Sequence, residues 1–229
     1  MRARKRSWGV SAPLVCAVLA GLWAAPLLAQ DGYRMERVEA APVGIAESVE
    51  KALSSQGARL LRGDGRTVAE LWLRKEVPLK ATAAGAGYGA LAEGTLVGVL
   101  RFPDGGSDFR GQSIAPGTYT LRYARIPQDG NHLGAAPEPD FLLLCPAAED
   151  RDLDAAIDFE SLMELSRPAT GTNHPGPLML QPIATGDFPG DQRNDLGHVA
   201  LRLKTSAKPA GSQAAQNFPL ALTLVGRAE

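Results

Sequence analysis

The chain has 229 residues, of which 45% are hydrophobic and 21% are charged, and its 24 basic residues nearly balance 25 acidic ones. This composition excludes wholesale disorder and a polybasic nucleic-acid binder. Beyond the N-terminus the sequence has no apolar run of about 18 residues, so it predicts no internal membrane span.

The first 29 residues have the organisation of a secretory signal peptide. Four basic residues precede an apolar stretch from Trp8 to Leu28, and Ala29 is the predicted cleavage site. Removal of residues 1–29 leaves 20 of the 24 basic residues against all 25 acidic ones, a net charge of about −5. We therefore expect a periplasmic or secreted protein that binds neither nucleic acid nor anionic lipid. The alternative is an uncleaved N-terminal segment that anchors the chain.

Short segments of strand character follow, divided by clusters of Gly, Pro, Asn and Asp. Residues 57–79 predict a hairpin around the turn at 63–65. Trp72, the one Trp outside the predicted leader, lies in its second strand and is expected to pack in the core. Further strands are predicted at residues 95–102, 118–126, 141–145, 178–183, 198–204 and 220–225, which makes about eight in all.

Two segments have helical spacing instead, at residues 46–55 and 153–165, and Asp150 or Asp152 is the predicted N-cap of the second. Residues 81–94 and 206–216 have the composition of surface loops. Together these elements predict a single all-β domain over residues 30–229. Its expected fold is an antiparallel β-sandwich of about eight strands with two short helices.

Two apparent motifs do not predict chemistry. The Gly-rich run at 85–90 loosely fits a dinucleotide fingerprint, but a strand follows it where a helix is required, so no cofactor is expected there. Cys145 ends the apolar run 141–144 and is expected to be a buried thiol. Because it is the one Cys outside the leader, no intramolecular disulfide is predicted.

Two of the three histidines lie in near copies of one phrase, NHLG at 131–134 and NHPG at 173–176. Both copies fall in predicted loops, where an imidazole can reach a ligand and neighbouring Gly lets the backbone approach it closely. This pattern has two interpretations. Either the histidines bind a divalent metal, or Asn and Gly simply supply turn conformations while His satisfies nearby carbonyl groups.

The metal interpretation names a specific set of ligands. His132 and His174 would supply nitrogen, Asp129 and Asp140 would supply oxygen, and His198 is a further candidate. Imidazole and carboxylate groups together suit a divalent transition metal. The duplicated wording does not itself place the two loops together in space.

Four sequence elements resemble those of a group of uncharacterised secreted bacterial proteins. The elements are DFRG at 108–111, PGTYTLRY at 116–123, DGNHLG at 129–134 and GTNHP at 171–175. The resemblance covers most of residues 70–180. It implies a secreted protein and attaches no activity to the chain.

The sequence favours a non-catalytic binding or structural accessory module whose partner is a small molecule or a protein. One alternative is a metal-dependent hydrolase or oxidoreductase centred on His132 and His174. Another is a carbohydrate-binding module, which requires an exposed row of aromatic side chains. The aromatic residues outside the leader fall mostly in apolar runs, so this alternative ranks last.

Overall fold

The structure is a computed structural model that describes residues 32–81, 87–127, 130, 132 and 134–228. The predicted leader therefore lies outside the described residues, as does Asp129. Within the described part of the chain there are thirteen β-strands, two α-helices and one short 3-10 helix. No helix in this part is long and apolar enough to cross a membrane.

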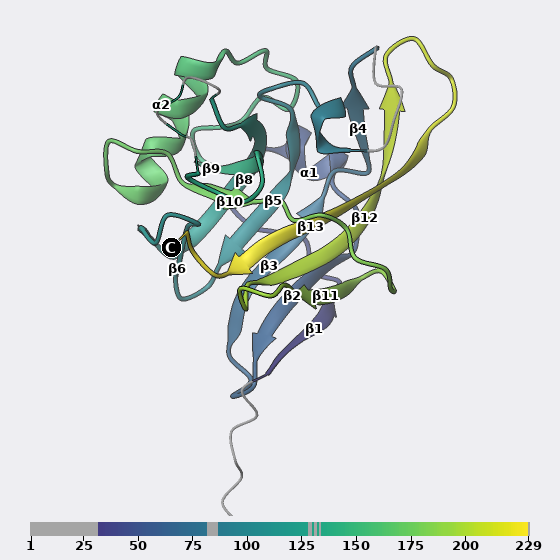
Figure 1. The fold of residues 1–229 in the computed structure, drawn as a ribbon. Coiled ribbons are helices and arrows are strands. Elements are labelled where there is room, and N and C mark those ends of the chain that lie inside the picture. The colour runs from purple at the N-terminus through teal and green to yellow at the C-terminus, as the bar shows by residue number, and fades with distance from the viewer. Residues whose placement is uncertain (1–31, 82–86, 128–129, 131, 133, 229) are drawn as a thin grey trace, which may run out of the picture.

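Seven strands form one curled antiparallel sheet (Figure 1). The turn between its second and third strands contains Gly65 at φ +86°, a left-handed conformation that glycine adopts without steric cost. In spatial order the strands are β1 (Tyr33–Val38), β2 (Gly57–Arg62), β3 (Thr67–Leu73), β5 (Leu96–Phe102), β8 (Gly117–Arg125), β9 (Asp140–Pro146) and β10 (Pro177–Met179).

A smaller sheet contains four strands, and β6 (Gly106–Ser107) pairs separately with β7 (Ser113–Ile114). In the smaller sheet the central strand β12 pairs with three others, and one of these pairings is parallel. A single bridge between Leu180 and Leu222 links this sheet to the end of the large one. The four strands are β4 (Glu76–Leu79), β11 (Gly190–Arg193), β12 (Val199–Pro209) and β13 (Gln216–Val225).

The main apolar core lies between the two sheets and takes side chains from both of them. The alternation of apolar and polar residues on β8 predicts one buried and one solvent-exposed face. Tyr119, Leu121 and Tyr123 do belong to this core, but Thr120 and Arg122 on the other face are buried as well. On β9, Leu142 and Leu144 point into the same core. The alternate residues Leu143 and Cys145 pack on the opposite face, which we call the outer face of β8–β9. Strand β9 is therefore buried on both faces.

Trp72 packs in a second apolar cluster, as the sequence predicts. Its indole Nε1 donates a hydrogen bond to the carbonyl oxygen of Ala40 at 3.0 Å, so burial leaves no unpaired polar atom on the ring. Helix α1 (Glu47–Ala52) contributes Val49 to this cluster.

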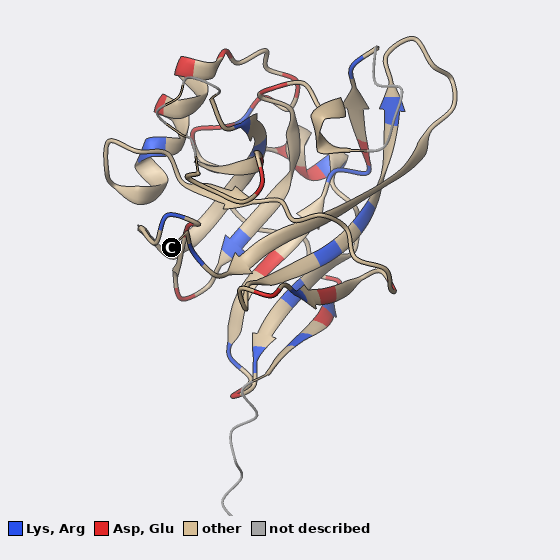
Figure 2. Ribbon diagram, viewed as in Figure 1, with Lys and Arg blue, Asp and Glu red and all other residues tan. Residues whose placement is uncertain are grey.

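Helix α2 (Phe159–Thr170) covers part of the outer face of β8–β9 (Figure 1). The predicted start of this helix was wrong, because its N-cap is Asp158, whose carboxylate accepts the N–H of Ser161 at 3.0 Å. The helix ends at Gly171, which is left-handed at φ +64°. Figure 2 shows acidic residues in its first half and a basic residue toward its C-terminal end, the order that the helix dipole favours.

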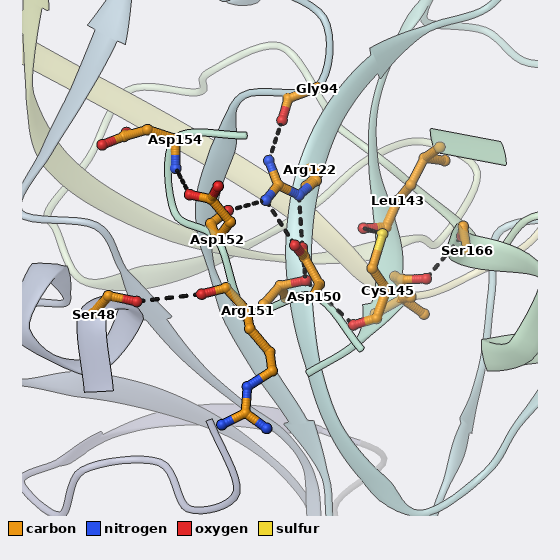
Figure 3. A network of polar contacts seen from close by, with 12 residues as sticks. Ser48, Gly94, Arg122, Leu143, Cys145, Asp150, Arg151, Asp152, Asp154 and Ser166 are labelled. Carbon is orange, nitrogen blue, oxygen red and sulfur yellow. Dashed lines mark hydrogen bonds and ion pairs between the residues drawn. The ribbon is translucent and has the colours of Figure 1, made fainter. Parts of the chain in front are cut away.

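Asp150, one of the two predicted N-caps, forms a buried ion pair instead (Figure 3). Arg122 donates from Nε and Nη2 to the Asp150 carboxylate at 2.6 and 2.7 Å. The remaining donors reach the carbonyl oxygens of Gly94 and Asp152 at 2.7 and 2.6 Å, and Thr120 donates to Asp150 as well. This network fixes the segment before α2 against β8, so the helix begins further along the chain than predicted.

The predicted mainly β chain with two α-helices is confirmed, and the hairpin of residues 57–79 contains β2 and β3 as expected. The described residues contain thirteen strands where about eight were predicted. The predicted loop at 206–216 is shorter than expected, because β12 continues to Pro209 and β13 begins at Gln216. A short 3-10 helix, η1 (Tyr88–Ala90), lies within the other predicted loop.

Candidate functional site

A pocket of about 380 Å³ lies on the outer face of β8–β9, beside α2. Its size falls within the usual range of small-molecule sites, about 300–1,000 Å³. Ala124 of β8, Leu143 of β9 and Met163 of α2 line it, together with the rings of Phe109 and Phe141. The pocket floor is apolar because consecutive residues of a strand face opposite sides, so β9 supplies one set of apolar side chains to the core and another to the pocket.

The rim of the pocket is cationic. Arg110, Arg125 and Arg167 line it together with His132 and His174, and no Asp or Glu is among its described lining residues. Arg125 is paired with Asp140, since its Nε lies 3.4 Å from Oδ1 of the carboxylate. Within the described residues no ion pair involves Arg110 or Arg167. These two guanidinium groups therefore have no ion-pair partner in the described part of the chain, although the charge of Arg110 also acts on nearby Asp108.

The loop that bears Arg110 is built around the buried carboxylate of Asp108. Asp108 Oδ1 accepts the backbone N–H groups of Arg110 and Gln112 at 2.9 and 2.8 Å, and Oδ2 accepts from Gln112 Nε2 at 2.5 Å. Burial raises the pKa of Asp108 above its usual value, although these hydrogen bonds act in the opposite direction. Phe109 donates its N–H to Pro177 at 2.8 Å and packs against Phe141. The loop thus directs one aromatic ring into the floor and one guanidinium to the rim.

Gln112 ties this loop to the one that bears His174. Its Nε2 donates to the carbonyl oxygen of Pro175 at 3.1 Å, and its Oε1 accepts from the hydroxyl of Thr172 at 2.7 Å. The same Thr172 hydroxyl oxygen accepts the N–H of His174 at 3.0 Å, and Thr170 donates to the His174 carbonyl at 2.8 Å. The backbone of the His174 loop is therefore held by the side chains of Gln112, Thr170 and Thr172.

The structure brings His132 and His174 to the same pocket, although they are 42 positions apart in the sequence. Asp140 is not one of the residues that line this pocket. Its Oδ1 accepts the hydroxyl of Tyr123 at 2.5 Å and pairs with Arg125. The Tyr123 pKa is raised by burial and by this carboxylate. Asp129, the other predicted oxygen ligand, lies outside the described residues.

His198, the further candidate ligand, occupies a different environment. Its ring is buried, and Nε2 donates to the carbonyl oxygen of Arg227 at 3.1 Å. Nδ1 then accepts from Asn194 Nδ2 at 3.3 Å, so both ring nitrogens have protein partners. The ring also meets Phe109 edge to face, with 5.4 Å between ring centroids. His198 thus packs against the floor residue Phe109 without itself lining the pocket.

No three side chains of His, Cys, Asp or Glu come together as a metal-binding group in the part of the chain that the structure describes. The metal hypothesis therefore stays a prediction that involves two imidazoles of one pocket. Cys145 is fully buried against α2, as expected, and burial raises the pKa of its thiol, which keeps it protonated.

Sequence reasoning found the two histidines through their repeated phrase but missed the three arginines. Arg110 follows β6, Arg125 ends β8 and Arg167 lies near the end of α2. Nothing in their local sequences relates them, because the fold alone brings them together. The Asp108 turn had a local signal, since Asp followed by Gly within three residues is typical of a turn stabilised by the Asp side chain.

Comparison of the chain with models of protein families, with curated proteins and with solved structures finds no match. The resemblance of the four sequence elements to secreted bacterial proteins stays a prediction. The chemistry of the pocket is thus the basis for assigning a function. Its ionisable groups are three guanidiniums and two imidazoles above an apolar floor.

Proposed function

We propose that the chain is a non-catalytic binding module, secreted or periplasmic, whose β-sandwich holds a small molecule in the pocket between α2 and the outer face of β8–β9. The observation that supports this proposal is the pocket itself. It combines an apolar floor with a few polar groups at the rim, the usual composition of a small-molecule site.

The surroundings of the pocket also suit a binding role. The floor residues of β8 and β9 belong to strands that are hydrogen-bonded on both sides in the seven-stranded sheet, and Gln112 links the loops of Arg110 and His174. A site held in one shape loses little conformational entropy when the ligand binds. The binding energy is then not spent on ordering the protein.

Filling the pocket tests the proposal. Ala135 is an exposed lining residue, so Ala135→Trp adds a ring at the pocket without overpacking the core. Ala215→Trp, on the exposed β12–β13 connection, is the matched control. Ligand-observed NMR with a panel of neutral, anionic and cationic aromatic fragments should show binding to the parent and to Ala215→Trp, and loss of binding to Ala135→Trp. Equal binding by all three proteins would place the fragments elsewhere and refute the proposal.

A metal-dependent enzyme is the second candidate, and one observation favours it, namely that His132 and His174 line the same pocket. Two neutral imidazoles can hold one divalent ion. Elemental analysis after zinc or copper challenge should then show bound metal in the parent and background levels in His132→Ala and His174→Ala. Parent protein that stays free of metal after the challenge would end this candidate.

A further inference from the structure

The charge of the pocket rim is opposite to that of the chain as a whole. The full sequence has a net charge of −1, and residues 30–229 carry about −5, yet every ionisable side chain among the described lining residues is Arg or His. These side chains come from separate elements, so their common sign does not follow from one basic stretch of sequence. A negative ligand is the complement of this rim.

The floor favours a different chemistry from the rim. Phe109, Phe141 and Leu143 are almost completely buried around it, and Met163 and Ala124 complete an apolar surface. A fully hydrated inorganic anion gains nothing from such a floor, because it would lose water without gaining hydrogen bonds there. An apolar group placed on the floor gains free energy in proportion to the apolar area that it removes from water.

We propose that the ligand of this pocket is a small organic anion, one carboxylate on an apolar aliphatic or aromatic body; the inference rests on the proposed function. The apolar body lies on the floor formed by Phe109, Phe141 and Leu143. The carboxylate faces the rim, where guanidinium groups present planar pairs of N–H donors that match its two oxygens.

Arg110 and Arg167 are the main recognition groups. Arg125 shares its charge with Asp140, which lowers its attraction for a second anion. Arg167 also suits its position near the C-terminal end of α2, where a cation is favoured by the helix dipole. That structural role does not apply to Arg110, which lies in a loop, so the two arginines provide independent tests.

Calorimetric titration of the full chain with matched probes separates charge from apolar character. The probes are octanoate, octan-1-ol, octylamine and acetate. We expect octanoate to bind at least about tenfold more tightly than octan-1-ol, because hydrogen bonds to a charged carboxylate are stronger than those to a neutral hydroxyl. Octylamine and acetate should bind more weakly than octanoate, because one has the wrong charge and the other lacks the body.

Variants assign the charge preference to the rim. Arg110→Gln and Arg167→Gln should each weaken octanoate binding by about tenfold and leave octan-1-ol binding unchanged. Arg37→Gln is the matched control, an exposed arginine on β1 at the far edge of the seven-stranded sheet from β9. It should change neither affinity. Melting curves of the three variants show whether each remains folded.

The outcomes distinguish this inference from the function on which it rests. Equal affinity for octanoate and octan-1-ol, unaffected by Arg110→Gln and Arg167→Gln, would overturn the anion and leave a pocket for neutral apolar ligands. Acetate that binds as tightly as octanoate would overturn the apolar body. Failure of all four probes, together with failure of the fragment panel, would overturn the binding function itself.

Discussion

Arg122 lies on β8 with its positively charged side chain fully buried in the interior (Figure 3). Asp150 neutralises this charge, and the carbonyl groups of Gly94 and Asp152 accept the remaining donors. Removal of one partner leaves the other charge buried without compensation. The network therefore depends on the opposite charges of Arg122 and Asp150, and a side chain of similar size without the charge cannot replace either of them.

Replacement of either member should destabilise the fold strongly. We expect Arg122→Leu and Asp150→Leu each to lower the free energy of unfolding by about 3–5 kcal/mol, measured by urea denaturation. The double variant should recover much of this loss, because it buries no charge. The exposed pair Arg66–Asp64 provides a control, and Arg66→Leu should leave the unfolding midpoint nearly unchanged. Additive losses in the double variant would contradict this account.

The buried carboxyl group of Asp108 should make the free energy of unfolding decrease as the pH rises. Burial raises the pKa of this carboxyl above its ordinary value of 3.8, so the folded protein holds the proton more tightly than the unfolded chain does. Its stabilising contribution is complete below the unfolded pKa and is lost as pH rises through the folded pKa. Free energies of unfolding measured across this range should decline more in the parent than in Asp108→Asn. Identical profiles would show that Asp108 does not titrate in this way.

Some elements could be predicted from local sequence alone, whereas the bounds of others depend on contacts between residues far apart in the sequence. Strands with a clear period of two, such as β8, could be predicted from alternation. Strand β1 was missed because its sequence YRMERV mixes charges with apolar residues, and β4 because it contains a proline. The start of α2 was misplaced because the sequence does not show that Asp150 pairs with Arg122 in the interior, and the helix is capped by Asp158 instead.

The N-cap of α2 can be tested directly. Asp158→Ala removes the acceptor for the N–H of Ser161 and should lower the Tm by a few degrees. Asp152→Ala, at the predicted but unused cap, is the comparison, since among the described residues its side chain accepts only the N–H of Asp154. We expect a smaller change there in thermal unfolding monitored by circular dichroism. A larger effect of Asp152→Ala would mean that the helix begins earlier.

The candidate site shows the same division between local and tertiary information. His132 and His174 stand out in sequence because histidine is rare in this chain and both follow Asn. The floor residues Phe141 and Leu143 look like any buried strand, and the sequence does not say which face of a doubly buried strand has a cavity. A pocket between a helix and the outer face of a sheet depends on where the helix lies, which long-range contacts determine.

For the whole molecule, the predicted leader has a direct test. Residues 1–29 combine a basic start, an apolar stretch and Ala29 before the cut, so we expect the exported protein to begin at Gln30. N-terminal sequencing of protein recovered from the periplasm or medium checks this expectation. Full-length chain with intact Met1 in a membrane fraction would instead support the anchored alternative.

The double burial of β9 has a consequence for how this scaffold can change over time. Leu142 and Leu144 pack in the main core, whereas Phe141 and Leu143 face the pocket. Adjacent positions of one strand are therefore under different selection. Under the proposed binding function, mutation at the pocket positions would alter the ligand preference, while the inward positions preserve the sheet. A combinatorial library confined to the pocket-lining positions Ala124, Phe141 and Leu143, with Arg122 and the core positions kept, is therefore expected to yield folded proteins with altered ligand preferences. Such variation would give descendants of one ancestor a route to different ligands.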